Sequence, residues 1–343
     1  MNYKELCSPE NLFRAFDEFI RGKRKKKDVI QFQENLEENI FELSSQLQGE
    51  AYEHGPYFRF HIWDPRFRII HKALVRDRIV HHALFEYLYG VFNKAFIFHS
   101  YSSRLKKGTH LGVKNLHKMM RKVSKNFTQE SYALKCDIKS FFASIDHDIL
   151  LEIIQKNIGD EEIFNLIRLI VKSFHTHTHT GIPLGNLTSQ IFANIYLNEL
   201  DQFIKHQLKI RYYARYADDF VILGERKEVL QEYIKAIEKF LVSKLRIGLH
   251  PRKTKIVKFR QGVDFLGYVL FPYHRTLRTK TKKRMFSRLS EKCSMGEWNA
   301  SVQSYLGMLK YANTEKLQQK VFKTAPLKGV ILKPRSPISL PRS

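Results

Sequence analysis

Two adjacent aspartates, Asp218 and Asp219, lie in the pentapeptide Tyr-Ala-Asp-Asp-Phe between two short runs of strand-forming residues. Residues 210–213 precede the pentapeptide, and residues 221–223 follow it, with aliphatic or aromatic side chains in both runs. This pattern predicts a β-hairpin that carries both carboxylates at its tip. Two neighbouring anions are costly without a positive partner, and a pair of divalent metals is the usual one.

A third aspartate, Asp137, ends another apolar run, which begins at Tyr132. Three carboxylates at two strand ends are the ligand set of a two-metal phosphoryl-transfer site, in which the ions bind the attacking and leaving oxygens. A single Asp-Asp pair would be weak evidence, since most acidic pairs lie in solvated turns. The third carboxylate therefore carries the interpretation.

The charge of the chain favours a polyanionic partner. The sequence has 59 Lys and Arg against 34 Asp and Glu, a formal net charge of +25, which exceeds what solubility requires. Basic residues interleave with 16 Tyr and 26 Phe, as suits a channel that follows a phosphate backbone and stacks bases. A hydrophobic content of 43% is enough for a packed core and excludes wholesale disorder.

The number of cysteines and the length of the apolar runs indicate in which cellular compartment the protein is expected. Cys7, Cys136 and Cys293 are odd in number and show no paired spacing, which argues for a reducing compartment and against a zinc site or a disulfide framework. We expect Cys136 to be a small buried hydrophobe. No apolar run approaches the ~20 residues that a membrane span needs, so we expect a cytoplasmic protein without a membrane partner.

Hydrophobic periodicity predicts an α+β fold in which strands alternate with helices up to about residue 272. Ser8 with Pro9 is typical of a helix start. Helices are expected over residues 9–19, 28–49, 75–93, 109–120, 146–157, 161–173, 189–208, 226–245, 281–292 and 299–321. Strands are expected in a hairpin over residues 56–72, before Asp137, before Gly181, on both sides of the aspartate pair, around Ile256 and over residues 263–270. From Arg275 onward the pattern is helical and basic.

Several charged segments have two readings. The basic run 21–27 fits a solvated loop or a nucleic-acid contact equally well. Arg76 and Arg78 fit pairing with acidic neighbours inside the fold. The alternation of His175, His177 and His179 places all three on one face of a strand, and a metal site is not favoured because no matching ligand cluster accompanies them.

Four further segments accompany the three aspartates. Residues 181–190, Gly-Ile-Pro-Leu-Gly-Asn-Leu-Thr-Ser-Gln, form a glycine loop before a helix, where backbone N–H groups can meet a nucleotide. The others are Val-Arg-Asp-Arg-Ile-Val at 75–80, Ser-Tyr with Arg104 and Gly-Thr at 100–109, and a stretch from 248–255 into Asp-Phe-Leu-Gly-Tyr at 264–268. In this order they resemble bacterial reverse transcriptases related to group II intron enzymes, over residues 10–320.

The resemblance implies a right-hand polymerase of fingers and palm with a small helical thumb. In this chain it predicts an N-terminal extension and fingers over residues 1–125, and the palm with some finger elements over 126–272. The thumb is expected over 273–328 and an unstructured tail over 329–343. It implies an RNA-directed DNA polymerase that binds a template RNA, a primer or cDNA strand, and deoxynucleoside triphosphates.

The resemblance also assigns roles to single residues. It makes Asp137, Asp218 and Asp219 the catalytic ligands of two Mg²⁺ ions, with Mn²⁺ as the alternative metal and the Ile138 carbonyl as an additional oxygen. Further implied substrate contacts are Arg66 and Arg68 at the triphosphate, Phe142 as the gate against a ribose 2′-OH, Leu184, Gly185 and Gln190 in the glycine loop, and Lys253. Residues 265–267 match the primer grip.

Two departures from the common pattern narrow the family. Leu184 stands where many reverse transcriptases have glutamine, and Gln190 stands where many have proline. This combination is similar to the signature of reverse transcriptases from diversity-generating retroelements, and residues 304–307 and 310–313 resemble their thumb. That subgroup implies copying of a template-repeat RNA with errors at adenines, and a small basic oligomeric accessory protein.

Other functions remain open at this stage. One is an antiphage-defence or retron-like reverse transcriptase that works with a structured RNA. Another, from a different class, is an inactive nucleic-acid-binding scaffold, which the retention of all three aspartates disfavours. Aromatic residues in apolar runs are usually core, so Phe142 also has a structural reading.

Overall fold

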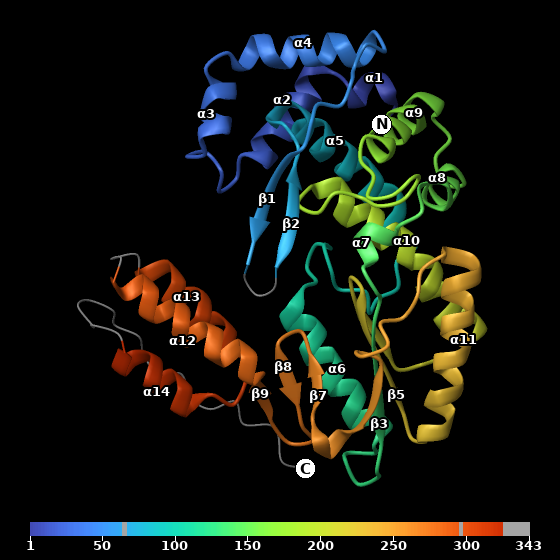
Figure 1. Ribbon diagram of the computed structural model, residues 1–343, viewed down its shortest axis with the longest axis vertical. Coiled ribbons are helices and arrows are strands. Elements are labelled where there is room, and N and C mark those ends of the chain that lie inside the picture. The colour runs from blue at the N-terminus through green and yellow to red at the C-terminus, as the bar shows by residue number, and fades with distance from the viewer. Residues whose placement is uncertain (64–66, 295–297, 325–343) are drawn as a thin grey trace. The chain divides into compact units, whose positions relative to one another are not determined.

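The computed structural model describes residues 1–63, 67–294 and 298–324. Two compact units make up the chain, Met1–Leu266 and Gly267–Ser343. Helices and strands mix along it, as the sequence predicts for an α+β protein (Figure 1). Arg66 and the tail expected over residues 329–343 lie outside the described residues.

The first unit begins with helices that pack on one another and on α5. They are α1 (Tyr3–Leu6), α2 (Pro9–Phe19), α3 (Lys27–Gln33), α4 (Leu36–Gln48) and α5 (Val75–Phe92). Ser8 caps α2 by accepting a hydrogen bond from the Asn11 N–H, which confirms the predicted start. The single helix expected over residues 28–49 is wrong, because Asn35 takes a non-helical conformation between α3 and α4. The Asn39 side chain donates to the Phe32 carbonyl and satisfies the end of α3.

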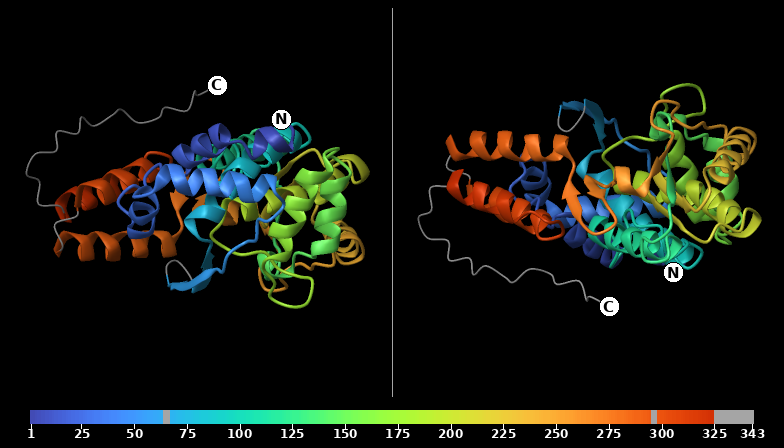
Figure 2. Two further views of the ribbon diagram at one scale, coloured as in Figure 1. Left: turned by 90° about the horizontal axis from the view of Figure 1, so that it is seen from above. Right: turned by 90° about the horizontal axis from the view of Figure 1, so that it is seen from below.

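The predicted hairpin is present as β1 (Phe58–Ile62) and β2 (Arg68–Lys72). The strands are antiparallel, with Phe58 opposite Lys72 and Ile62 opposite Arg68. All of β1 is exposed. Figure 2 shows the hairpin projecting from the helices of the same unit.

A four-stranded sheet with the order β4-β5-β3-β6 forms the centre of the first unit. Its strands are β3 (Tyr132–Asp137), β4 (Tyr213–Tyr216), β5 (Asp219–Gly224) and β6 (Lys255–Lys258). β3 and β5 are buried along most of their length, and α6 (Thr109–Val123) contacts both β4 and β5. Their apolar side chains join a core that extends into α5 and α10 (Leu187–Gln202). The strands and hairpin predicted around the aspartates are therefore confirmed.

The further helices of this unit are α7 (Phe141–Ser144), α8 (His147–Gln155), α9 (Glu161–Lys172) and α11 (Lys227–Leu245), with a short 3-10 turn η2 (Phe259–Gln261). Of these, α11 packs on β5 and α10, whereas α8 packs on α9 and α10. The helix expected over residues 189–208 starts earlier, at Leu187, and its last turn is the π-helix η1 (Phe203–Gln207).

The strand expected before Gly181 is wrong. His177 and Thr180 pair across a tight turn, in which the Thr180 N–H donates to the His177 carbonyl at 3.0 Å. His179 has a φ of 59°, which a strand cannot contain. The three histidines therefore do not share one strand face.

Residues with non-strand or non-helical conformations interrupt the elements that were expected after residue 262. The strand expected over residues 263–270 is two, β7 (Val263–Phe265) and β8 (Tyr268–Leu270), because Leu266 and Gly267 both have positive φ. β8 pairs with β9 (Arg275–Leu277), so the segment after Arg275 is not helical from its start. The helices that follow are α12 (Thr279–Ser294), α13 (Trp298–Leu309) and α14 (Glu315–Thr324).

The helix expected over residues 299–321 is also two helices, α13 and α14. Asn313 leaves the helical path, because its N–H donates to the Arg275 carbonyl at 2.8 Å. The Thr314 hydroxyl donates to the Leu309 carbonyl and closes the end of α13. Side chains that bond locally to the backbone compete with helix continuation in this way.

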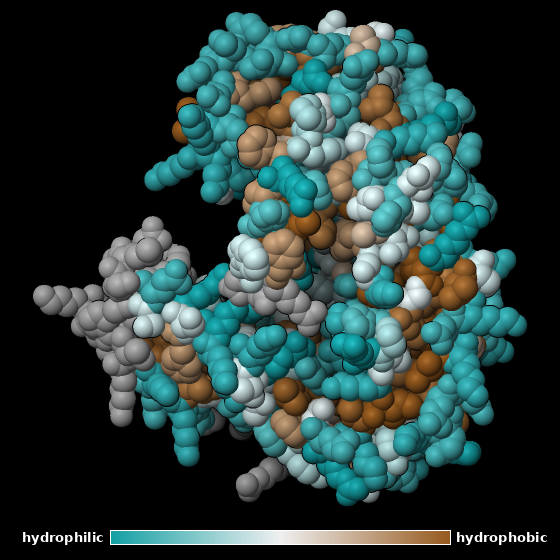
Figure 3. Space-filling model, viewed as in Figure 1, coloured by the Kyte–Doolittle hydropathy of each residue, from teal (hydrophilic) through white to brown (hydrophobic). Residues whose placement is uncertain are grey.

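Cys7 and Cys136 are buried free thiols, and burial raises the pKa of Cys136. This confirms the expected environment of Cys136. No helix in the described part of the chain is long and apolar enough to cross a membrane. Figure 3 shows hydrophilic residues over most of the viewed face.

Candidate active site

The three aspartates meet at one edge of the central sheet. Asp137 ends β3 directly opposite Asp219, the first residue of β5. Ala217 and Asp218 form the turn between β4 and β5, and the Ile138 N–H donates to the Asp218 carbonyl at 3.2 Å. Strand pairing thus brings together residues that are about eighty positions apart in the sequence.

The carboxylates at this edge destabilise one another's charged forms. Burial, with a contribution from Asp137, raises the pKa of Asp218. Burial also raises the pKa of Asp219 to about 6; Asp137 and Asp218 add to this effect, and Lys135 opposes it. The Asp219 Oδ1 atom is buried and has no hydrogen-bond partner in the described part of the structure. A buried carboxylate oxygen without a partner is an available ligand for a cation.

Two lysines face these carboxylates. The Lys253 Nζ atom lies 2.5 Å from Asp137 Oδ1. The Lys135 Nζ atom lies 3.4 Å from Asp219 Oδ2 and donates to the Asp264 carbonyl at 2.9 Å. Within residues 1–63, 67–294 and 298–324, no group of three His, Cys, Asp or Glu side chains is arranged as a complete metal site. The donor types and the unpartnered oxygen nevertheless fit divalent cations, which would take the place of the lysine ammonium groups.

Lys253 is among the residues singled out in the sequence, whereas Lys135 is not. A signal for Lys135 was present, because alternate residues of a strand share a face and Lys135 lies two positions before Asp137. The Lys135 side chain is only 11% exposed. Lys135 therefore belongs to the same site as Asp137 and Asp219.

The glycine loop packs against the second strand of the hairpin. The His71 N–H donates to the Leu184 carbonyl at 2.9 Å, and the Asn186 side chain donates to the His71 carbonyl at 2.8 Å. The Asn186 Oδ1 atom accepts from the Ala73 N–H at 3.1 Å. Leu184 is half-buried and Gly185 is exposed. The loop and hairpin are therefore held in one arrangement.

Arg68, at the start of β2, is exposed, and its positive charge lowers the pKa of Asp218 among smaller contributions. The guanidinium is thus close enough to the aspartates to act on them electrostatically. Arg66, its neighbour in the predicted triphosphate site, lies outside the described residues. Arg68 thus lies on the strand that the glycine loop contacts, and its charge acts on Asp218.

Gly185 is required by both space and conformation. Its φ is +115°, and a Cβ atom there would lie 2.5 Å from the Ile70 Cγ2 atom. Gly185→Ala is therefore expected to push the loop from β2, to destabilise the fold by about 1–3 kcal/mol and to raise the KM for deoxynucleotides. Thermal unfolding and steady-state primer extension measure the two effects.

Gly90→Ala is the matched control for Gly185→Ala. Gly90 lies in α5, and a Cβ atom there meets nothing within 4 Å. Alanine is a better helix former than glycine, so this variant should unfold at the parent temperature or above it. Equal unfolding temperatures and equal KM values for Gly185→Ala and the parent would contradict the role given to Gly185.

The two neighbouring phenylalanines differ in environment. Phe141 is buried, whereas Phe142 is only partly buried and packs at the margin of the core. The Phe142 carbonyl accepts from the Ile182 N–H at 2.8 Å, which ties α7 to the start of the glycine loop. Phe142 is therefore less buried than Phe141, and its backbone is fixed to the start of the glycine loop.

Gln190 and the primer-grip segment occupy different positions. Gln190 is exposed on α10, and its Oε1 atom accepts from the Ser103 hydroxyl at 2.7 Å. Phe265 is buried, and Leu266 has a φ of 51°. The Phe265 side chain is therefore part of the core. Any primer contact made by residues 265–267 would come from the backbone of the turn at Leu266 and Gly267.

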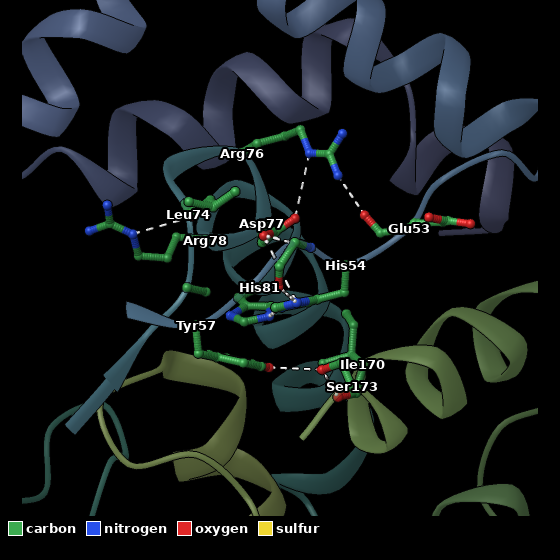
Figure 4. A network of polar contacts seen from close by, with 12 residues as sticks. Glu53, His54, Tyr57, Leu74, Arg76, Asp77, Arg78, His81, Ile170 and Ser173 are labelled. Atoms are coloured by element: carbon green, nitrogen blue, oxygen red, sulfur yellow. Dashed lines mark hydrogen bonds and ion pairs between the residues drawn. The ribbon is translucent and has the colours of Figure 1, made fainter. Parts of the chain in front are cut away.

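A network of polar contacts fixes the segment that leads into β1. Asp77 is fully buried and accepts hydrogen bonds from the Tyr52 hydroxyl at 2.9 Å and the Gly55 N–H at 3.2 Å. His54 and His81 face each other with their Nε2 atoms 3.2 Å apart. Figure 4 shows these histidines beside Asp77, beneath Arg76.

Arg76 and Arg78 both have partners inside the fold. The Arg76 Nε atom lies 3.6 Å from Asp77 Oδ1, and its other nitrogens donate to the Gln46 side chain and the Glu53 carbonyl. Arg78 donates to the Asp28 carboxylate. Asp28 also pairs with Lys72 at the end of β2. The reading of these arginines as structural pairs is therefore confirmed, and they help to hold the base of the hairpin.

Comparison with known proteins agrees with the residues gathered here. The family model described as reverse transcriptase (RNA-dependent DNA polymerase) matches residues 63–270, more than half of the chain. This segment contains the three aspartates, both lysines and the glycine loop.

Individual relatives are distant. Protein YkfC of Escherichia coli (strain K12) is 23% identical over 283 residues, which cover 70% of this chain and 71% of that protein. The group II intron-encoded protein LtrA of Lactococcus lactis subsp. cremoris is 24% identical over 356 residues, which cover 82% of this chain and 58% of LtrA.

A similar fold occurs in a solved structure of apo telomerase from Candida tropicalis, truncated from the C-terminal domain. The TM-score is 0.51 at 14% sequence identity, with 69% of this chain and 59% of that chain covered. At this identity the likeness concerns the fold alone. The family match over residues 63–270 shows that the chain belongs to the reverse transcriptases, the RNA-directed DNA polymerases.

Proposed function

We propose that this protein copies an RNA template into DNA by two-metal phosphoryl transfer at the edge of the central sheet. The observation that carries the proposal is the register of Asp137 opposite Asp219, with Asp218 in the adjoining turn and an unpartnered Asp219 oxygen. Asp137, Asp218, Asp219 and the Ile138 carbonyl would hold two Mg²⁺ ions, or Mn²⁺. Such ions activate the attacking 3′-hydroxyl and neutralise charge on the leaving pyrophosphate.

The chain's own residues would position the substrates. Arg68, at the start of β2, and Arg66 would bind the triphosphate, since guanidinium groups suit phosphate oxygens. Lys253, whose ammonium group lies 2.5 Å from Asp137 Oδ1, would bind a phosphate oxygen of the incoming nucleotide once metal ions neutralise Asp137. The carboxylates, hairpin and glycine loop would then form the palm and fingers of a right hand, with the helices after Thr279 as the thumb.

The substrates are a template RNA, a primer or growing cDNA strand, and deoxynucleoside triphosphates. The net charge of +25 supports binding of a long phosphate backbone. We place this activity in the cytoplasm, where RNA and nucleotides are present. Primer extension on an RNA template with labelled deoxynucleotides tests the proposal directly.

Phe142→Val should admit ribonucleotides. Phe142 is partly buried, and its backbone bonds to the start of the glycine loop; if its ring borders the sugar of the incoming nucleotide, a smaller side chain leaves space for a 2′-hydroxyl. Forcing extra atoms into a packed site costs about 1–3 kcal/mol, so deoxynucleotide preference is expected to fall roughly ten- to a hundredfold. Competitive primer extension with a ribonucleotide and a deoxynucleotide measures the preference. Phe141→Val, at the buried neighbour, should instead lower stability, and an unchanged preference in Phe142→Val would make Phe142 a core residue only.

We further propose that the enzyme serves a diversity-generating retroelement. The support is the combination of Leu184 and Gln190 in the glycine loop. The template would be a repeat RNA copied with errors at adenines, and a small basic oligomeric accessory protein would assist. A nearby pair of near-identical repeats that differ at adenines in the genome would distinguish this role from an antiphage-defence or retron-like one.

Leu184→Gln should lower the error rate opposite template adenine while DNA synthesis continues. Leucine cannot make the hydrogen bond that glutamine would offer beside the incoming nucleotide, and one polar contact is worth up to about 1.5 kcal/mol, or roughly tenfold in discrimination. Deep sequencing of cDNA from parent and variant on one RNA measures the rates. Equal rates, or a parent that is already faithful at adenine, would remove the retroelement assignment and leave a general reverse transcriptase.

A further inference from the structure

A buried ion pair lies beneath the turn that carries Asp218. Arg215 in β4 and Asp201 near the end of α10 are both fully buried. The Arg215 Nε and NH2 atoms donate to the two Asp201 oxygens at 2.8 and 2.6 Å, and the Tyr213 hydroxyl donates to Asp201 Oδ1 at 2.7 Å. Two parallel hydrogen bonds to Asp201 therefore fix the orientation of the guanidinium group.

The remaining side of this guanidinium faces the turn. The Arg215 NH1 atom donates to the Ala217 carbonyl at 3.2 Å and to the Asn194 Oδ1 atom at 3.3 Å. Ala217 has a φ of 51°, a left-handed conformation that residues with a Cβ atom adopt at a cost. Such a conformation persists only where surrounding contacts hold it, and the bond to Arg215 is one such contact.

The same network reaches the loop that contains Ser102. The Asn194 side chain donates to the Ser102 carbonyl at 2.9 Å. On the backbone, the Arg215 N–H donates to the His99 carbonyl at 2.9 Å, and the Tyr101 N–H donates to the Arg215 carbonyl at 3.0 Å. Arg215 thus connects α10 and this loop to the tip of the β4–β5 hairpin.

We propose that Arg215 is a positioning residue that fixes the Ala217–Asp218 turn for metal binding, an inference that rests on the two-metal site proposed above. Stability of the core does not by itself account for the Arg215–Asp201 pair, because replacing a buried ion pair by apolar side chains of similar volume is often neutral or stabilising. An apolar side chain could not donate to the Ala217 carbonyl. The guanidinium nitrogen that Asp201 leaves unused is therefore the side-chain donor that holds the Ala217 carbonyl, next to the backbone bond from the Ile138 N–H to the Asp218 carbonyl.

The test compares Arg215→Lys with Tyr213→Phe in the full-length protein. A lysine keeps the charge next to Asp201 but cannot bond to both Asp201 oxygens and the Ala217 carbonyl at once. Tyr213→Phe removes a buried hydrogen bond to the same Asp201 and leaves the turn untouched. The probe is Mn²⁺, with binding followed by electron paramagnetic resonance in the complex with an RNA template, a dideoxy-terminated primer and the next deoxynucleotide.

Arg215→Lys is expected to weaken Mn²⁺ binding about tenfold or more, as for loss of one charged hydrogen bond. The Mg²⁺ concentration for half-maximal primer extension should rise by a similar factor, and excess Mg²⁺ should restore activity. Tyr213→Phe should lower the unfolding temperature while its Mn²⁺ affinity stays within twofold of the parent. An unchanged affinity in Arg215→Lys, or equal losses in both variants, would overturn the proposal.

Two further variants complete the design. Ala217→Gly removes the cost of this φ, so adding it to Arg215→Lys should restore part of the lost Mn²⁺ affinity; no recovery in this double variant counts against the proposal. Asp218→Asn separates the two hypotheses. If it binds Mn²⁺ as the parent does, the two-metal site itself is wrong, whereas a clear loss in Asp218→Asn with none in Arg215→Lys overturns only the role of Arg215.

Discussion

Asp218→Asn is expected to lose DNA synthesis by roughly a thousandfold or more, because metal-ion stabilisation of the transition state is worth several kcal/mol and each 1.36 kcal/mol is a factor of about ten. The amide keeps the shape of the carboxylate but removes its charge. Single-nucleotide primer extension at saturating Mg²⁺ measures the loss. Substantial residual synthesis with Mg²⁺ or Mn²⁺ present would contradict the assignment of Asp218 as a metal ligand.

The same substitution should leave the fold as stable as the parent, or more stable, at neutral pH without divalent metals. Burial and Asp137 raise the pKa of Asp218 in the folded protein. At pH values above that pKa the ionised carboxylate lowers the free energy of unfolding, and this loss disappears only when acid protonates the group. A neutral amide avoids it. Asp17→Asn, at an exposed position of α2, is the control and should retain activity. A lower unfolding temperature in Asp218→Asn would indicate a structural aspartate.

The placement of the aspartates could be predicted from the sequence because local signals determine it. Strand formers on both sides of Asp218 and Asp219 require a hairpin, and the apolar run before Asp137 requires a strand. The direct pairing of Asp137 with Asp219 is a matter of register between distant strands. The sequence predicted three carboxylates of one metal site at two strand ends, but not which residues of the two strands lie opposite each other.

The elements that were predicted wrongly share a physical cause. Leu266, His179 and Asn35 have backbone conformations that end a strand or helix, although none of them is a glycine or proline; only the break at Leu266 has an adjacent glycine, Gly267, to mark it. Positive φ at Leu266 and His179 is imposed by the rest of the fold. Apolar periodicity continues across such positions, so the sequence predicts one element where the structure has two or has a turn.

The contacts that complete the site are long-range and polar. The bond between the His71 N–H and the Leu184 carbonyl joins residues 113 positions apart, and the bond between Lys253 and Asp137 joins residues 116 positions apart. Such pairings leave no local pattern in one sequence. Arg215 is different, since an arginine within a predicted buried strand requires an acidic partner, and that signal could have pointed to Asp201.

Asp201→Ala is expected to destabilise the fold by about 3–5 kcal/mol, because it leaves the buried guanidinium of Arg215 and the Tyr213 hydroxyl without their partner. Since folded domains are stable by about 5–15 kcal/mol, this is a large part of the total. Chemical denaturation followed by circular dichroism measures it. Glu152→Ala, which breaks an exposed ion pair with Lys156, should unfold close to the parent.

The double variant Asp201→Leu with Arg215→Met separates the contribution of the ion pair to stability from its effect on the Ala217–Asp218 turn. It replaces the buried pair by apolar side chains, a change that is often neutral or stabilising. Stability should therefore return to near the parent value, while Mn²⁺ binding stays weak because nothing donates to the Ala217 carbonyl. Recovery of both would mean that the pair contributes only to the core. Recovery of stability alone would show that an ordered fold is insufficient, and that the turn beneath Asp218 needs the guanidinium itself.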